Sequence, residues 1–542
     1  MNFYFILINF FYVYFVFAVG FLVNKNFLKL EIDKELTIIT GIIYISLIGL
    51  LINFFLPLSK LVNTIFLFYI ILYSLFYYKE IITKKNLKLF FILGFVNIFL
   101  ILGTHHNRPD ALIYHLPYIA TLNEEKIIFG LNNINYRFGH TAIIQYLSAM
   151  SNNYLFGTNG ISLYLPIAFS SLIYFFYKEI KKNTNNFLRL LSVFFLCIIL
   201  IKLNRVSEYG NDYWSHFYFL LGFYLVLKSI IKKKFNYEDF FQLSIILSFA
   251  FLNKIFLIVG GIYLVFITKK FNKINYFFNK KNIFILFFLI IFFLKNVINT
   301  GCIIYPLDQT CFENLNWTAK INNYGNAKKV SVDSESWSKD WPNFFRYNQN
   351  KITQEEYISN FFWFDTWKKN HLFQILKKIF PVIILIIIMS TMLSNNKVQE
   401  KLFNKKLLFI SFFILSIWFL KFPLYRFGLS IIIVNIMCIF FYFLQKYKKS
   451  LLNKKKIIFL VTLCLLISIF QNSKKIIKNR NELIPNIYAE QTYNKVYNND
   501  NEFIMNLSKM NYCGYTALCS NFDNSNNIIL SDFFNYKIYN VK

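Results

Sequence analysis

Residues 90–140 read FFILGFVNIFLILGTHHNRPDALIYHLPYIATLNEEKIIFGLNNINYRFGH, and they join an apolar run directly to a polar loop. The first part, 90–103, has no charged side chain. The second part, 104–140, holds four of the six histidines, two arginines, one aspartate and two glutamates. A membrane-embedded chain gains no stability from gathering so many titratable groups, so their presence indicates function. We therefore expect apolar helices that hold this loop, and its chemistry, at a membrane surface.

Composition places the whole chain among membrane proteins. Of its 542 residues, 56% are hydrophobic and 16% are charged, whereas soluble proteins average about 25% charged residues. The apolar runs are continuous rather than alternating, so helices and not a closed barrel would satisfy the backbone in lipid. The expected fold class is an all-α polytopic membrane protein with about 14 (12–14) transmembrane helices, each needing roughly 20 apolar residues, and with two large outer-face segments.

The net charge of +31 has a membrane explanation. A nucleic-acid binder would gather its lysines and arginines on one folded face. Here they fall in short segments between apolar runs, as the positive-inside rule describes, where anionic headgroups also attract them. The pattern predicts membrane lipids as partners and argues against nucleic acid.

Successive basic loops fall on one face of the membrane when each apolar run counts as one span. The segment 140–154 is also apolar, but a span there would invert every later loop. We therefore expect it to be a helix that lies at the outer interface or re-enters the membrane. The predicted spans are 2–23, 36–55, 61–78, 87–103, 160–177, 187–203, 213–229, 240–252, 255–268, 283–297, 376–393, 407–420, 428–444 and 457–470.

This topology divides the chain into six parts, three of them on the outer face. They are amino-terminal transmembrane helices (1–103), an outer catalytic loop with interfacial helices (104–159), a transmembrane core (160–297), an outer loop with a disulfide (298–375), carboxyl-terminal transmembrane helices (376–470) and an outer tail (471–542).

The seven cysteines support this orientation. Two close pairs, Cys302 with Cys311 and Cys513 with Cys519, fall in segments assigned to the outer face. Paired cysteines in an oxidising compartment predict disulfides, and the alternative is four free thiols. Neither pair has the further ligands at the spacing of a zinc site. The other cysteines lie inside apolar runs, where free Cys behaves as a small hydrophobic residue.

Asp110 is the candidate catalytic residue. It begins a stretch that predicts a helix, DALIYHLPYIATLNEEK, and a carboxylate there has two interpretations. It either caps free backbone N–H groups, or it faces a polar cavity and acts as a general base on an acceptor hydroxyl. Tyr114 lies four residues on, on the same helix face, and is a candidate for binding substrate. His115 lies about 140° around an α-helix, so it is either a packing residue or a substrate contact that the loop fold brings in.

Four more residues near predicted helix ends are candidates for binding substrate: Arg137, His140, Lys254 and Arg426. Arginine binds a phosphate in bidentate fashion, and lysine binds it as a point charge. The alternative is that the long side chains only reach the lipid headgroups. Two further outer carboxylates, Glu208 and Asp212, predict a solvated loop rather than a site for acceptor or metal.

The sequence lacks several familiar catalytic motifs. It contains no Walker loop, GxGxxG, GxSxG or HExxH pattern, so neither ATP-driven transport nor a zinc-protease mechanism has its marker. No cofactor is indicated, and the question of a divalent metal stays open.

Three stretches, PDALIYHLPYIATLNEEKIIFGLNNINYRFGH, GCIIYPLDQTC and FPLYRFG, resemble the GT-C superfamily of membrane glycosyltransferases. This superfamily includes protein O-mannosyltransferases and lipid A aminoarabinose transferases. Within it, the chain is most similar to bacterial multi-spanning members. The resemblance covers roughly residues 85–430, and it is carried mainly by the loop that contains Asp110.

The resemblance implies an inverting transferase in the bacterial inner membrane with its active site on the periplasmic, outer side. The donor would be a polyprenyl-phosphate-linked sugar, and the acceptor a glycan, lipid or protein of the envelope. Asp110 matches the catalytic aspartate of the first outer loop, whereas Lys254 and Arg426 match phosphate-binding positions. Three rival functions stay open at this point: a polysaccharide polymerase or ligase, a transporter of lipid-linked sugars, and a non-catalytic membrane scaffold.

Overall fold

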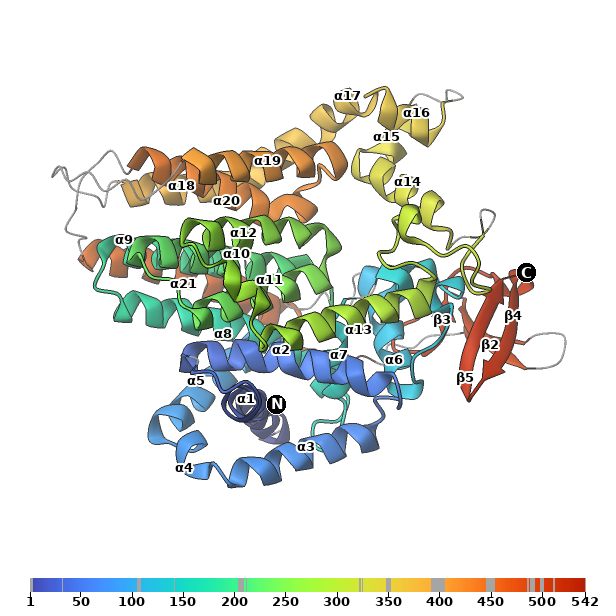
Figure 1. Cartoon of the computed structure of the whole chain (residues 1–542), viewed down its shortest axis with the longest axis horizontal. Coiled ribbons are helices and arrows are strands. Elements are labelled where there is room, and N and C mark those ends of the chain that lie inside the picture. The colour runs from blue at the N-terminus through green and yellow to red at the C-terminus, as the bar shows by residue number, and fades with distance from the viewer. Residues whose placement is uncertain are drawn as a thin grey trace.

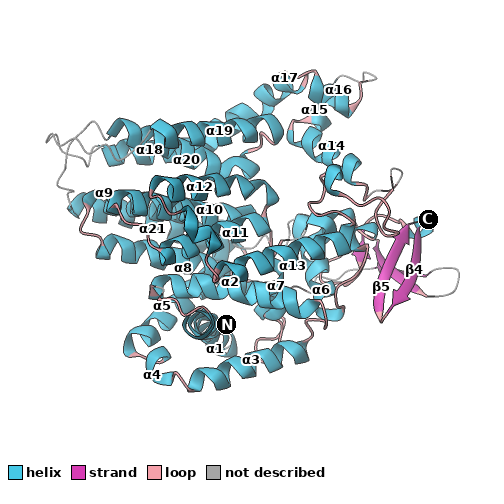
Figure 2. Ribbon diagram, in the orientation of Figure 1, coloured by secondary structure: helices cyan, strands magenta, loops and turns pink. Residues whose placement is uncertain are grey.

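The computed structural model shows a mostly helical chain with a small amount of β-structure near the carboxyl terminus (Figures 1 and 2). The residues that the structure describes are 3–31, 33–104, 109–140, 142–202, 209–210, 212–320, 323, 325–347, 352–390, 405–444, 454–484, 487, 493–497, 502–509 and 512–541.

Every apolar run predicted from the sequence contains a helix. A continuous apolar run can satisfy its backbone groups in lipid only by bonding within itself, which is what a helix does. The run 255–268 is the one that is divided, into a 3₁₀ segment, η6 (Ile255–Gly260), and α12. The helices at these places are α1 (Phe3–Leu22), α2 (Lys34–Asn53), α3 (Lys60–Leu75), α5 (Lys84–Ile101), α8 (Gly160–Lys182), α9 (Asn186–Lys202), α10 (Asp212–Lys232), α11 (Tyr237–Asn253), α12 (Gly261–Lys270), α13 (Asn282–Thr300), α18 (Phe373–Ser390), α19 (Lys405–Lys421), α20 (Tyr425–Leu444) and α21 (Lys454–Lys478).

Eight helical stretches among the described residues are long and apolar enough to cross a membrane. The prediction of a helical membrane protein is thus confirmed in this coarse form. Other helices fall short of the roughly 20 apolar residues of a span: α9 and α11 have 17 residues each, and α5 begins with three lysines in KKNLK. The eight stretches are Tyr4–Phe27, Lys34–Asn53, Gly160–Lys182, Asp212–Lys232, Asn282–Thr300, Trp363–Met389, Tyr425–Phe443 and Lys455–Lys478.

Shorter helices fill the connections between the long ones. The apolar segment 140–154 contains α7, whose residues are all buried and which packs against α2, α6 and α8. Seven residues are too few to cross a bilayer, and the complete burial of α7 shows that other helices enclose it. The short α-helices are α4 (Tyr78–Ile81), α6 (Leu116–Glu124), α7 (Ile144–Met150), α14 (Ala327–Ser338), α15 (Trp341–Tyr347), α16 (Gln354–Ser359) and α17 (Trp363–Trp367).

The carboxyl-terminal tail corrects the all-α prediction, because it forms two small sheets. In the first sheet, β2 pairs with β1 in antiparallel fashion and with β3 in parallel fashion. The second sheet is the antiparallel β4–β5 hairpin. Short strands leave a much weaker sequence signal than a run of 20 apolar residues. The strands are β1 (Tyr493–Tyr497), β2 (Phe503–Ser508), β3 (Cys519–Ser520), β4 (Ile528–Phe533) and β5 (Tyr536–Val541).

Three segments that are far apart in the sequence meet at one end of the helices, where Figure 1 shows α6, α14 and the strands. The Gly130 N–H donates to the Ile298 carbonyl at 2.8 Å, and the Phe129 N–H donates to the Lys537 carbonyl at 3.0 Å. The Cys513 N–H donates to the Leu112 carbonyl at 2.9 Å. The loop that contains Asp110, the start of the 298–375 segment and the tail therefore lie on the same side of the helical body.

Both predicted disulfides are present, Cys302–Cys311 and Cys513–Cys519. The three remaining cysteines are free and buried, as predicted. The second disulfide closes a loop that lies directly on the polar loop, because the N–H groups of both Cys513 and Gly514 donate to Leu112. Its covalent constraint therefore acts on the helix that begins beside Asp110.

Removing the Cys513–Cys519 bond is expected to destabilise this docking. A disulfide that closes a loop this short stabilises a protein by about 2 kcal/mol, so the double variant Cys513→Ser/Cys519→Ser should unfold at a lower temperature. The measurement is thermal unfolding in detergent with and without reductant. A Cys302→Ser/Cys311→Ser background isolates the effect, because it leaves one disulfide to reduce. An unchanged midpoint on reduction of that background would contradict the prediction.

Candidate functional site

The polar loop begins with a widened helical turn. Residues Ala111–His115 form a π-turn, η2, in which the Leu116 N–H donates to the Ala111 carbonyl five residues before it. The α6 helix follows at once, with Pro117 in its first turn. A proline has no N–H to donate and its ring clashes with the carbonyl four residues earlier, which explains why the helix widens here. Single π-turns occur frequently at functional sites.

Asp110 stands at the start of this turn, and its side chain makes no capping hydrogen bond to the helix. The helix-cap interpretation is therefore wrong. Instead, its Oδ2 accepts a hydrogen bond from Arg426 Nη1 at 3.1 Å. The Asp110 side chain is 40% exposed, so the carboxylate is paired on one side and open on the other.

Arg426 joins Asp110 to a second, buried carboxylate. Its Nε donates to Asp212 Oδ2, and Asp212 Oδ1 accepts from Lys254 Nζ at 2.5 Å. Exposure falls along this series, because Asp212 is 14% and Lys254 10% exposed in their side chains. We call Asp110, Arg426, Asp212 and Lys254 the ion-pair chain. It alternates in sign, and it runs from an open carboxylate to a buried ammonium group.

The helix ends explain why these side chains meet. Pro423 lies between α19 and α20, and since the residue before a proline avoids the helical region, a new helix starts just beyond it, with Arg426 in its first turn. Lys254 is the extended residue between α11 and η6, and Asp212 is the first residue of α10. All three therefore lie at helix ends on the side of the molecule that carries the polar loop.

Burial affects the protonation of the Lys254 side chain. It lowers the pKa of the ammonium group to about 8, against the opposing effect of Asp212. Lys254 Nζ also lies 4.2 Å from the centroid of the Phe427 ring. An ammonium group in this position does not reach for headgroups, so the snorkelling interpretation of Lys254 is wrong.

Tyr114 and Arg137 lie beside the open end of the ion-pair chain. The Arg137 guanidinium carbon is 5.4 Å from the Tyr114 ring centroid, and Arg137 Nε donates to the Tyr136 hydroxyl at 3.1 Å. Burial raises the pKa of Tyr114, and the charge of Asp110 raises it further. The structure thus brings together six of the seven residues proposed from the sequence: Asp110, Tyr114, His115, Arg137, Lys254 and Arg426.

The two histidines among the candidates lie against neighbouring side chains and are not cations. His115 Nδ1 is 3.0 Å from Gln145 Nε2, and its ring is tilted by 47° against the Tyr114 ring, with 4.1 Å between the centroids. His140 lies against Tyr305 of the disulfide loop, with 5.2 Å between ring centroids. Burial lowers the pKa of each histidine to about 4, so both are neutral at pH 7. His115 positions Tyr114, and His140 does not bind phosphate as a cation.

Two residues of the site were missed by sequence reasoning. Asp212 was expected in a solvated loop together with Glu208; for Asp212 that is wrong, and Glu208 lies outside the described residues. His216 lies one turn further along α10, where Nε2 is 2.8 Å from the Arg426 carbonyl and Nδ1 is 2.8 Å from Ser430 Oγ. The i, i+4 pair of Asp212 and His216 at the start of an apolar helix is the signal that could have indicated both.

The carboxylates do not form a metal-binding set. Asp212 faces a guanidinium and an ammonium group, and Asp110 faces the same guanidinium. Among the residues that the structure describes, no group of three or more His, Cys, Asp or Glu side chains could hold a metal ion. A divalent cation would have to displace Arg426, so the ion-pair chain as it stands suits hydrogen bonding to anions and hydroxyls.

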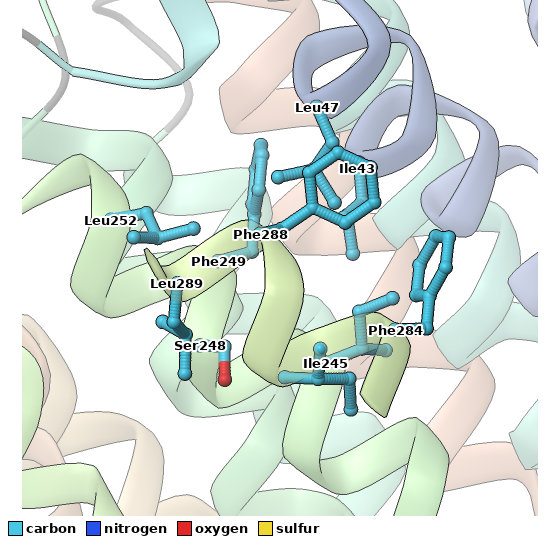
Figure 3. Close-up of a pocket in the computed structure, with 10 residues that line it drawn as sticks. Ile43, Leu47, Ile245, Ser248, Phe249, Leu252, Phe284, Phe288 and Leu289 are labelled. Atoms are coloured by element: carbon cyan, nitrogen blue, oxygen red, sulfur yellow. The ribbon is translucent and has the colours of Figure 1, made fainter. Parts of the chain in front are cut away.

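A hollow elsewhere in the molecule is lined by apolar rather than charged side chains. It lies where α2, α11 and α13 meet, and Figure 3 shows that side chains such as Ile43, Phe249 and Phe288 line it. The only side-chain oxygen that Figure 3 draws there is that of Ser248. Apolar packing space of this kind offers no group for acid, base or phosphate chemistry.

Comparison with known proteins identifies a family. A family model described as "Domain of unknown function (DUF8201)" matches residues 3–433. The matched region includes every residue of the ion-pair chain and ends before the β-strands of the tail. No curated protein and no solved structure matches the chain.

Proposed function

The chain belongs to the DUF8201 family, and for this member we propose a membrane glycosyltransferase that moves a sugar from a polyprenyl-phosphate donor to an envelope glycan, lipid or protein. The observation that carries the proposal is the Asp110 carboxylate. Its side chain makes no capping hydrogen bond to the helix, it accepts a hydrogen bond from Arg426, and 40% of it is exposed among the described residues. These are the properties of a positioned general base with access to a substrate.

The proposed reaction is an inverting displacement. Asp110 takes the proton of an acceptor hydroxyl while the hydroxyl oxygen attacks the anomeric carbon of the donor sugar. The bond between that carbon and the phosphate oxygen breaks, and polyprenyl phosphate leaves with the bonding electron pair. Arg426 orients Asp110 throughout, because Asp212 fixes the guanidinium at Nε while Nη1 holds the base.

The leaving phosphate gains negative charge, and the site offers donors for it. An arginine has five N–H groups, and the bonds to Asp110 and Asp212 use two of those on Arg426. Arg137 adds a second guanidinium beside Tyr114. Two cations and two anions make the ion-pair chain neutral, so Arg137 supplies the positive charge in excess. Stabilising a developing oxyanion in this way lowers the barrier of the transfer step.

The proposal includes a topology. The fourteen helices at the predicted runs would all cross the bacterial inner membrane, with the shorter ones tilted less or enclosed by neighbours. The end of the helical body that carries the polar loop, the two disulfides and the tail would face the periplasm. Disulfides in this end support the assignment, because they persist in oxidising compartments.

The test combines genetics with a reaction in liposomes. Deleting the gene is expected to remove one sugar from an envelope glycan, and a plasmid copy of the wild type should restore it, as mass spectrometry of the glycans would show. Purified protein in liposomes with a polyprenyl-phosphate-linked sugar and acceptor should release polyprenyl phosphate. An unchanged glycan profile together with no release of polyprenyl phosphate would overturn the proposal.

A polysaccharide polymerase or ligase is the second candidate, because two arginines, Arg137 and Arg426, lie at the open end of the site. Such an enzyme joins whole lipid-linked glycans. Its deletion would therefore shorten or remove an entire polymer rather than one sugar.

A transporter of lipid-linked sugars would move its substrate across the liposome membrane without forming any new glycosidic bond.

A further inference from the structure

The β4–β5 hairpin of the tail ends in two exposed phenylalanines. The Phe533 residue is 59% exposed and Phe534 is 82% exposed. They form the turn together with Asn535, and Phe533 is paired with Tyr536 across the strands. A water-exposed hairpin tip normally carries polar turn residues rather than adjacent aromatic ones.

The backbone conformation of this turn is unfavourable for phenylalanine. Phe534 has φ +48° and Asn535 has φ +62°. Two consecutive residues at positive φ are the signature of a tight hairpin turn that favours Asn-Gly or Asp-Gly, because a bulky side chain is strained there. Asn535 follows the rule, whereas Phe534 breaks it. An exposed aromatic ring at a strained position indicates that the ring is needed for a contact.

The hairpin reaches the level at which a candidate span ends. The Tyr536 hydroxyl donates to the Phe54 carbonyl at 2.9 Å, directly after α2. Since α2 has 20 residues and each residue rises 1.5 Å, the helix matches the roughly 30 Å hydrocarbon core of a bilayer. Its end therefore lies at the membrane boundary. The next residues, Phe55 and Leu56, are 67% and 51% exposed.

The surroundings of the tip resemble the interfacial zone of a membrane. Tyrosine is enriched at that level, and Lys126 Nζ lies 3.6 Å from the Tyr536 ring centroid. Lys60, the first residue of α3, is also exposed, and it lies close to Leu56 in the sequence. Lysines beside exposed apolar side chains suit a bilayer with anionic headgroups.

We propose that the β4–β5 hairpin inserts Phe533 and Phe534 into the headgroup region of the membrane, beside the exposed residues at the end of α2. This apolar patch contacts the lipid surface, because the patch is continuous with the end of a membrane span. The polar loop is attached to β5 of the same hairpin, because Phe129 pairs with Ile538 and the Tyr539 N–H donates to the Phe129 carbonyl at 2.9 Å. The hairpin thus fixes the height of the tail, and through it the height of the polar loop, above the bilayer. This inference does not depend on sugar transfer.

The test places a fluorescent probe at the tip. Phe534→Cys in the full-length protein gives one exposed thiol, since the native cysteines are either buried or in disulfides. The labelled protein is placed in liposomes of zwitterionic and anionic lipids that carry a spin label at the headgroup or at the end of the acyl chain. Interfacial segments enter roughly 5–10 Å, so the headgroup label should quench the probe and the chain-end label should not.

Lys495→Cys on the exposed edge of β1 is the matched control, because among the described residues the backbone pairing of that strand is with β2 and not with a span end. We expect the headgroup label to quench the probe at 534 at least about twofold more strongly than the probe at 495. Phe533→Cys repeats the measurement if the first variant accumulates poorly. Equal quenching at the two sites would overturn the proposal. Weak lipid quenching combined with protection from aqueous iodide would also overturn it, because the tip would then be covered by protein.

Discussion

Replacing Asp110 with asparagine is expected to lower the rate of sugar transfer about 10²–10⁴-fold, the range that a general base contributes. The loss should appear in kcat rather than in KM, because the carboxylate acts on the acceptor proton in the transition state. Stability should change little. The pair with Arg426 is 40% and 37% exposed in its two side chains, and exposed ion pairs contribute about 1 kcal/mol or less. Asparagine also keeps an oxygen that can accept from Arg426.

Glu124→Gln is the matched control for this experiment. Glu124 belongs to the same polar loop, lies at the end of α6 and is exposed, so its change should leave both transfer and membrane abundance unaltered. Both variants are compared with the wild type at equal membrane abundance, by glycan mass spectrometry in cells and by polyprenyl phosphate release in liposomes. If Asp110→Asn retains most of the activity, the general-base mechanism is wrong and the polymerase or ligase candidate, with Arg426 as its central group, gains support.

The Asp212→Asn variant should lose about 3–5 kcal/mol of stability, the effect of removing one partner from a buried ion pair. Lys254 would lose its carboxylate while 10% exposed, and Arg426 would lose the group that fixes Nε. Burial already lowers the pKa of Lys254 to about 8 against the pull of Asp212. Without that carboxylate the pKa falls further, so the lysine either loses its proton or opens the site to water. Thermal unfolding in detergent measures the loss.

A second substitution tests the cause of this destabilisation. Adding Lys254→Met to Asp212→Asn removes the unpaired ammonium group, and well-packed apolar replacements of a buried pair are often neutral. The double variant should therefore recover most of the lost stability but not the activity, because Arg426 stays loosely held. Asp365→Asn, at an exposed site on α17, serves as the control and should change stability by less than about 0.5 kcal/mol. If the Asp212→Asn variant alone were as stable as the wild type, the ion-pair chain would not contribute to the stability of the fold.

The sequence by itself determined where the long helices lie. Each apolar run contains one, since lipid leaves a continuous apolar segment no other way to satisfy its backbone. It also determined the two disulfides, because cysteines that lie close together outside the apolar runs bond readily in an oxidising compartment. Asp110, Lys254 and Arg426 stood out for a similar reason: a charged side chain beside an apolar run is conspicuous. The sequence did not determine the number of spans, since helices such as α9 and α11 are shorter than a bilayer requires.

Only the tertiary structure decided which of these groups act together. Asp110 and Arg426 are separated by 316 residues, and Asp212 and Lys254 by 42. No local periodicity records such pairings, so Asp212 was assigned to a solvated loop although it is the buried centre of the ion-pair chain. The strands of the tail were missed for the same physical reason. A two-stranded hairpin is marginal in isolation, and β5 is held in place by Phe129, which lies far earlier in the chain. Local chemistry fixes the helices, whereas contacts between their distant ends create the site.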